Sequence, residues 1–124
     1  MSTNPQQILK IPSAAFIASG DTLALNHGNP LPVDGIEQLW IDIDVTATSG
    51  TNTPTLIPSW ERLGEDGIYY PVWTGTGITG TGQTSIDIGP GLTIAMSPGL
   101  QGKLAWAITG TTPSFTFSAS IQGK

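Results

Sequence analysis

The sequence predicts an all-β protein: an antiparallel β-sandwich, jelly-roll-like, with about eight or nine short strands and no substantial helix. Apolar and polar residues alternate with a period of two through most of the chain, as in strands with one buried face. No long stretch keeps the apolar stripe of an amphipathic helix. The 124 residues include 16 Gly and 10 Pro, and 10% are charged. This composition favours short strands joined by tight turns.

The beginning of the chain carries the weakest strand signals. Residues 1–13 are polar and contain two prolines, so we expect an N-terminal arm or a first edge strand there. A single β-sandwich domain is then expected over residues 14–124. Within it, the runs 14–19 and 22–25 flank a Gly-Asp pair, which predicts a first hairpin.

The middle of the chain predicts a long strand followed by a hairpin. In the long strand, 36–48, one face is apolar and the other mainly polar. The apolar face holds Leu39, Ile41, Ile43, Val45 and Ala47, and the other face holds Trp40, Asp42, Asp44 and Thr46. Strands 54–62 and 67–73 form the expected hairpin, and Pro71 indicates an edge or a bulge in its second arm.

The last third of the chain predicts four more strands. Two short ones, 84–89 and 91–96, surround a Gly-Pro-Gly turn. The run 103–110 places Trp106 on an apolar face, so this tryptophan is expected in the core. The run 114–122 alternates apolar residues with Ser and Thr, which is typical of a half-buried strand.

Two turns of similar sequence interrupt these strands: SGTNTPTL at 49–56 and TGTTPSF at 109–115. In each, a glycine allows a change of direction, and a proline then fixes the backbone of the outgoing strand. We interpret them as two charge-free hairpin turns at one end of the sandwich. Exposed loops on a rigid scaffold often carry binding, so Thr51, Asn52 and Thr111 are candidate interface residues.

Charge and composition disfavour several classes of partner. The net charge is −5, and the four Lys and Arg residues are scattered, so binding to nucleic acid or to an acidic membrane surface is not expected. No cysteine is present to form a disulfide or a zinc–thiolate site. The first residues lack the apolar region of a signal peptide, which predicts synthesis in the cytoplasm.

No catalytic, cofactor-binding or metal site is predicted, and we do not expect an enzyme. His27 is the single histidine, and its turn-rich surroundings indicate a loop residue with an unusual φ angle. Asp42 and Asp44 share one strand face, a spacing compatible with acid–base work on sugars or with Ca²⁺. Such a pair is more often a solvated face that blocks unwanted sheet pairing.

Aromatic residues form the second group of candidate interface positions. Exposed aromatics on a sheet can anchor a protein interface or stack on sugar rings. The alternative is that a second sheet or a loop covers them. The candidates are Trp40, Trp60, Trp73, Tyr69 and Tyr70.

A family resemblance is carried by two stretches, IDVTATSGTNTPTLIPSWERLGEDGIYYPVW and KLAWAITGTTPSFTFSASIQGK. They resemble small β-sandwich structural proteins encoded among the virion genes of tailed bacteriophages. The resemblance covers about the C-terminal two-thirds of the chain. One departure is the pair Tyr69-Tyr70, where the family pattern has one aromatic after Asp-Gly. The resemblance implies a capsid-decorating, head-fibre or tail-associated role.

The leading hypothesis is therefore a phage virion structural protein, a capsid decoration or cement protein on the outer shell. Its expected partners are the major capsid protein or other virion proteins, and further copies of itself, with a trimer favoured. Two alternatives stay open: a tail- or neck-associated virion component, and a carbohydrate-binding module that uses the exposed Trp and Tyr residues.

Overall fold

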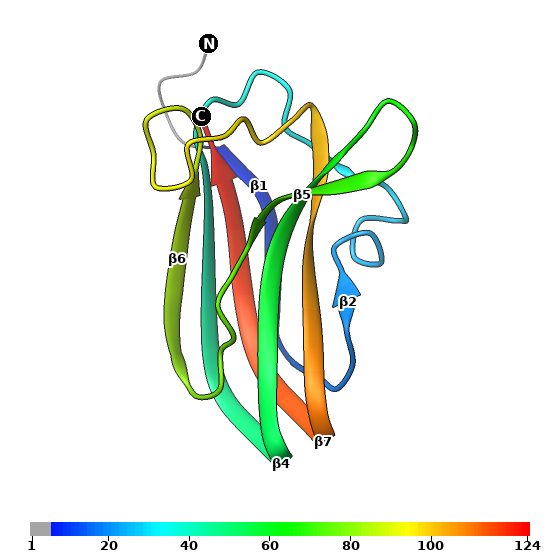
Figure 1. Cartoon of the computed structure of the whole chain (residues 1–124), viewed down its shortest axis with the longest axis vertical. Coiled ribbons are helices and arrows are strands. Elements are labelled where there is room, and N and C mark those ends of the chain that lie inside the picture. The colour runs from blue at the N-terminus through cyan, green and yellow to red at the C-terminus, as the bar shows by residue number, and fades with distance from the viewer. Residues whose placement is uncertain (1–5) are drawn as a thin grey trace.

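The structure is a computed structural model that describes residues 6–124, and within them it is all-β with no helix (Figure 1). Seven strands are present, fewer than the eight or nine expected, because two of them each cover a region that was expected to form two strands. The strands are β1 (Gln6–Phe16), β2 (Gly20–Asp21), β3 (Leu31–Pro32), β4 (Leu39–Leu63), β5 (Tyr69–Thr74), β6 (Gly82–Ile88) and β7 (Gln101–Gly123). No helix long enough to cross a membrane occurs among these residues.

All seven strands belong to one hydrogen-bonded sheet, and their pairings are antiparallel. The 25 residues of β4 and the 23 residues of β7 pair along nearly their whole length, from Leu39 opposite Gly123 to Arg62 opposite Gly102. The main order is β1-β7-β4-β5; β6 also pairs with β4, and β2 and β3 pair with β7. The antiparallel prediction is thus confirmed.

The sheet bends sharply where the two similar turns lie, and we call this region, residues 49–55 and 109–114, the corner. It forms the lower end of the molecule in Figure 1, with both halves of β4 and β7 running upward from it. On one side of the corner β4 lies between β6 and β7, and on the other side between β5 and β7. The predicted strands 36–48 and 54–62 are therefore parts of one continuous strand, β4, and the predicted strands 103–110 and 114–122 are parts of β7.

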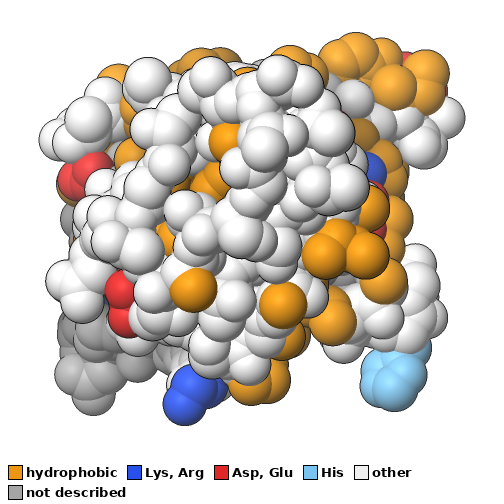
Figure 2. All heavy atoms as spheres, turned by 90° about the horizontal axis from the view of Figure 1, so that it is seen from below, with side chains coloured by type: hydrophobic (Ala, Val, Ile, Leu, Met, Phe, Trp, Pro, Cys, Tyr) orange, Lys and Arg blue, Asp and Glu red, His pale blue; other side chains and the backbone are white. Residues whose placement is uncertain are grey.

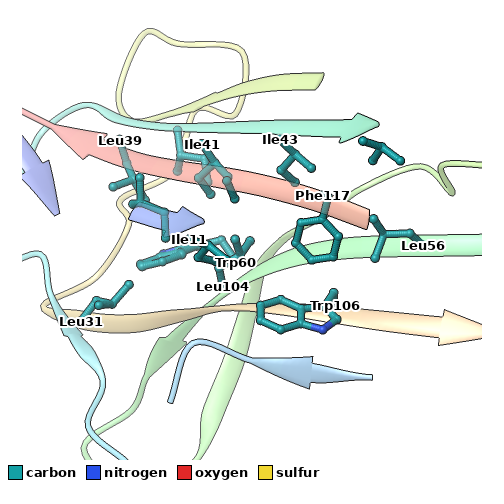
Figure 3. Packing of buried hydrophobic residues seen from close by; sticks show 14 of the residues in the cluster. Ile11, Leu31, Leu39, Ile41, Ile43, Leu56, Trp60, Leu104, Trp106 and Phe117 are labelled. Carbon is teal, nitrogen blue, oxygen red and sulfur yellow. The ribbon is translucent and has the colours of Figure 1, made fainter. Parts of the chain in front are cut away.

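One hydrophobic core receives side chains from both halves of the bent sheet (Figure 3). Ile41, Ile43 and Phe117 come from one half, and Trp60 and Leu104 come from the other. Each fully buried aliphatic or aromatic side chain stabilises the fold by roughly 1.5–3 kcal/mol. The core thus holds the two halves of the sheet together.

The core prediction for Trp106 is confirmed, since 6% of this side chain is exposed. Its indole packs edge-on against two phenylalanines, with ring centroids 5.3 Å from Phe16 and 5.6 Å from Phe117. The two phenylalanine rings stack on each other at 4.4 Å. These contacts attach β1 to β7 on the inner face of the sheet.

The alternation predicted for 36–48 is confirmed from Leu39 to Val45 but not at Ala47, which is exposed. The strand itself begins at Leu39. A register shift between Val45 and Ala47 inserts an extra residue opposite β7. Such a bulge turns the following side chains to the other face, which explains the exposure of Ala47.

The predicted strand 22–25 is wrong, because the chain forms turns after β2. The Asp21 carboxylate accepts a hydrogen bond from the backbone N–H of Leu23 at 3.0 Å. Backbone bonds from Leu25 to Thr22 and from Asn26 to Leu23 close the next turns. An aspartate that bonds the backbone two residues later favours a turn over a strand.

The predicted strand 91–96 is also wrong. The run 91–96 forms no strand and makes an isolated parallel bridge, between Ile94 and Ile88. The N–H of Leu92 bonds to the carbonyl of Gly89 at 3.1 Å, which turns the chain immediately after β6. Residues 89–100 are therefore a connection between β6 and β7.

The predicted hairpin 54–62/67–73 is confirmed as the pairing of β4 with β5. A register shift follows Trp60, which stands opposite Trp73, while Glu61 stands opposite Pro71. Pro71 thus lies beside a bulge in an edge strand, as expected.

The N-terminal segment predicted as an arm or edge strand contributes residues 6–13 to β1, which lies at one edge of the sheet. Residues 1–5 lie outside the described residues. The division of the chain at residue 13 stays a prediction.

Candidate functional site

The corner brings the two similar turns into direct contact. Thr51 stands opposite Thr111 in the register of β4 and β7, and the Asn52 side-chain amide donates to the Thr111 hydroxyl at 2.5 Å. The turns do lie together at one end of the molecule, as predicted. They are not hairpin turns, however, because each strand continues through the corner beside the same partner.

The reason for using one turn sequence twice is a reciprocal contact between glycine and proline. Gly50 and Gly110 have φ angles of +120° and +119°. A Cβ atom on Gly50 would lie 2.9 Å from the Cα of Pro113, and one on Gly110 would lie 3.0 Å from the Cα of Pro54. Each strand thus needs a glycine at the point where the proline of the other strand approaches.

Three residues at the tips of the corner have left-handed backbone: Asn52 at φ +59°, Thr53 at +52° and Thr112 at +46°. Asparagine tolerates this region, whereas a β-branched threonine rarely adopts it. Local bonds hold the two threonine turns: the Thr55 hydroxyl donates to the Thr53 carbonyl at 3.0 Å, and the Thr112 hydroxyl to the Thr111 carbonyl at 2.8 Å. The tips are therefore ordered and strained.

The end of the molecule that carries the corner is poor in charge. Figure 2 views this end, and its centre is made of uncharged side chains and backbone, with charged groups around the margin. The candidate residues Thr51, Asn52 and Thr111 are all exposed. They form one continuous, uncharged polar surface at the tip.

Trp60 does not belong to the surface of the chain. Its exposed fraction is 0%, and its indole N–H donates to the carbonyl of Pro98 at 3.0 Å. Trp73 stands directly opposite it and remains partly exposed. Trp73 lines a hollow of about 310 Å³ together with Ile78 and Ile86. Of these two hairpin tryptophans, only Trp73 can therefore contact a partner.

Tyr69 and Tyr70, on the β5 arm of the hairpin, each lie against a cation, Lys103 of β7 and Arg62 of β4 respectively. The Lys103 ammonium is 4.4 Å from the Tyr69 ring centroid and also pairs with Asp21 at 3.0 Å. The Arg62 guanidinium carbon is 5.0 Å from the Tyr70 ring centroid. Both phenol rings therefore already make a cation–π contact within the chain.

Tyr70 is further held in place by Asp66. The Asp66 carboxylate accepts a hydrogen bond from the Tyr70 hydroxyl, with 2.5 Å between the two oxygen atoms. This bond, together with a bond from the backbone N–H of Ile68, lowers the pKa of Asp66 below its usual value. The same hydrogen bond raises the pKa of Tyr70, because the carboxylate accepts it only from the protonated phenol.

We expect Asp66→Asn to return the pKa of Tyr70 toward its ordinary value, since the neighbouring negative charge is lost. An alkaline titration followed by NMR of the tyrosine Cζ carbons measures this directly. Glu65→Gln, which removes a neighbouring exposed carboxylate on the same loop, is the matched control and leaves the Tyr70 titration in place. Equal Tyr70 pKa values in the wild type and in Asp66→Asn would contradict the role of this bond.

Trp40, Asp42 and Asp44 lie together on the outer face of β4, as predicted from their alternation. Asp42 accepts a hydrogen bond from the Ser85 hydroxyl of β6. A groove of about 590 Å³ crosses this face over Asp42 and Asp44. A second hollow of about 250 Å³ lies against Trp40 and is also lined by Asp87.

His27 has a φ angle of +57° and an exposed side chain in the turns after β2, which confirms the predicted loop position. Among residues 6–124, no group of three or more His, Asp or Glu residues is arranged to hold a metal ion. The Ca²⁺ alternative for Asp42 and Asp44 therefore gains no third acidic ligand within that part of the chain.

The candidate residues thus fall into three separate regions: the corner, the β4–β5 hairpin and the outer face around Trp40. The sequence does not predict which residues of the neighbouring strands surround Trp40. Two of them are Asp87 on β6 and Gln122 on β7. Both residues follow the period-two alternation of their own strands. Their position beside Trp40, however, depends on how these strands are aligned with β4.

No protein-family model matches the sequence, and no curated protein matches it significantly. The fold is similar to that of a solved structure, the SPBc2 prophage-derived protein YomS, with a TM-score of 0.51 and 13% sequence identity. The alignment covers 100% of this chain and 98% of YomS. A structural neighbour of this chain is thus a prophage-derived protein of nearly the same extent, and at this identity the likeness concerns the fold.

Proposed function

We propose that this protein is a structural component of a phage particle that decorates the capsid shell and contacts a shell protein through its corner. The observation that carries the proposal is the pair of exposed, strained and uncharged tips. Residues held in sparsely populated backbone regions cost on the order of 1–3 kcal/mol each and cluster at binding sites. The fold similarity to a prophage-derived protein supports the assignment to phage.

An uncharged polar tip suits contact with another protein. Such a surface can be buried without removing water from ions, which is the main cost of burying charged groups. The net charge of −5 suits the outer side of a shell, away from the packaged DNA. In this proposal the bent sheet serves as a sandwich-like support for the tips, and three copies assemble around one attachment point.

The test is to place a charge at the corner. Thr51→Lys and Thr111→Lys are expected to change the free energy of unfolding by about 0.5 kcal/mol or less, as is usual for surface positions. Each variant should lower the fraction of protein that co-sediments with purified empty shells by about tenfold, because the lysine must be desolvated at the contact. Thr93→Lys, at an exposed position in the connection between β6 and β7, is the matched control and keeps wild-type binding.

Unchanged co-sedimentation of both corner variants would remove the corner from the contact. Separated heads and tails from the same particles distinguish shell decoration from the tail- or neck-associated alternative. Mass photometry measures the oligomeric state, and a trimer is the expected species. A monomer that binds neither heads nor tails would overturn the proposed function.

A further inference from the structure

The outer face of β6, β4, β7 and β1 presents polar side chains in regular rows. Strand register places Asp87 and Gln122 on either side of Trp40, and Ser85 and Ser120 on either side of Asp42. Because paired residues in neighbouring antiparallel strands point to the same side of a sheet, these side chains face solvent together. Trp40 is thus an aromatic ring within a polar surface.

This face is hollowed rather than flat. The groove of about 590 Å³ and the hollow of about 250 Å³ share Asp42, Ser85 and Gln122 in their linings. The larger groove continues across β7 to Lys10 on β1. Four adjacent strands span about 14 Å from the first to the last, so the combined hollow can hold an extended ligand of several rings.

The chemistry around Trp40 matches a sugar better than a protein partner. A ring that is partly exposed offers a flat apolar surface for the C–H face of a pyranose. Carboxylates such as Asp42 and Asp87 accept hydrogen bonds from hydroxyl groups, and the Gln122 amide can both donate and accept. Cores of protein interfaces are depleted in charged residues, whereas here two aspartates line the hollow beside the indole.

We propose that this face binds a neutral oligosaccharide, with Trp40 as the stacking surface and Asp42, Asp87 and Gln122 as hydrogen-bonding groups. Neutral sugars are favoured because Asp42 and Asp44 line the groove together with one cation, Lys10, and this excess of negative charge repels anionic glycans. The Lys124 ammonium lies 5.7 Å from the Trp40 ring centroid, at the outer limit of a cation–π contact. A sugar stacked on this face of the indole would displace the Lys124 side chain.

The site lies near the start of β4, well separated from the corner along the strand. Short cello-, malto- and chito-oligosaccharides are the probes, titrated separately into the full chain. At least one series should give saturable changes in tryptophan fluorescence. In NMR titrations of the same chain, the backbone amides of Trp40, Asp42 and Gln122 should shift.

Trp40→Ala should weaken binding by about tenfold or more, because it removes the stacking surface. Trp73→Ala is the matched control: this tryptophan is also partly exposed but lies on β5, away from the polar face, and its loss should leave affinity unchanged. Asp42→Asn keeps the size of the side chain and should weaken binding through the lost charge-assisted bond to a sugar hydroxyl.

No saturable response to any of the three series would overturn the proposal. Unchanged affinity of Trp40→Ala, or shifts confined to the β4–β5 hairpin, would do the same. If Trp40→Ala fails to fold, the shifts in the wild-type chain decide the question. Binding to shells without binding to sugars would leave the proposed function standing and remove this inference alone.

Discussion

Trp60→Ala is expected to lower the free energy of unfolding by about 3–5 kcal/mol. The side chain is fully buried between the halves of the sheet, so its removal leaves a cavity in the core. It also leaves the carbonyl of Pro98 without its indole donor, and an unsatisfied buried acceptor costs about 1–3 kcal/mol. Urea denaturation followed by circular dichroism measures the change.

Trp73→Ala is the matched control for this experiment, because Trp73 faces the same side of the sheet opposite Trp60 but is partly exposed. It should destabilise the protein less. Trp60→Phe, which keeps an aromatic ring and loses the bond to Pro98, should fall between the two. Equal losses for Trp60→Ala and Trp73→Ala would show that Trp60 is not a core residue in solution.

The same pair of tryptophans shows where sequence reasoning stops. The sequence places them on the two arms of one hairpin, and the structure pairs them directly opposite each other. Their difference in burial arises because β4 is a central strand and β5 is an edge strand. Strand order in a sheet depends on contacts between segments far apart in sequence, such as β4 with β7. The pattern of one hairpin does not contain this information.

The long strands show a similar limit. Alternation correctly predicted that residues 39–45 and 115–121 each bury one face. The sequence between two such runs, Gly-Thr followed by Pro, is typical both of a hairpin and of a bend. The structure has a bend because the partner strand carries a matching bend at the same level, with Thr51 opposite Thr111. Two similar motifs that bend together could have suggested this pairing.

The face around Trp40 was predictable in part. The alternation of Trp40, Asp42 and Asp44 placed them on one side of a strand, and the structure confirms it. Asp87 and Gln122 come from strands whose register the sequence did not specify. At the beginning of the chain, β1 contains two register shifts and Pro12, which interrupt its alternation of apolar and polar residues. The sequence therefore does not predict this strand over its full length.

Gly50→Ala and Gly110→Ala are each expected to destabilise the protein by about 2–4 kcal/mol, since the new methyl group meets both backbone strain and a steric contact. Both φ angles lie in the region that alanine avoids. The added Cβ would lie 2.9 Å from the Pro113 Cα in the first variant and 3.0 Å from the Pro54 Cα in the second. Backbone atoms of the opposite strand cannot move aside without opening the corner.

Gly80→Ala is the matched control, because Gly80 has no neighbour within 4 Å of the added Cβ and no left-handed φ angle. Its effect should stay within about 0.5 kcal/mol. The double variant Gly50→Ala/Gly110→Ala tests whether the two contacts act as one unit. Once one glycine–proline contact has opened the corner, the second substitution should cost less, by about 0.5 kcal/mol or more. Strictly additive losses in urea denaturation would mean that the two strands bend independently, and the duplicated turn would then have no joint role in folding the sheet.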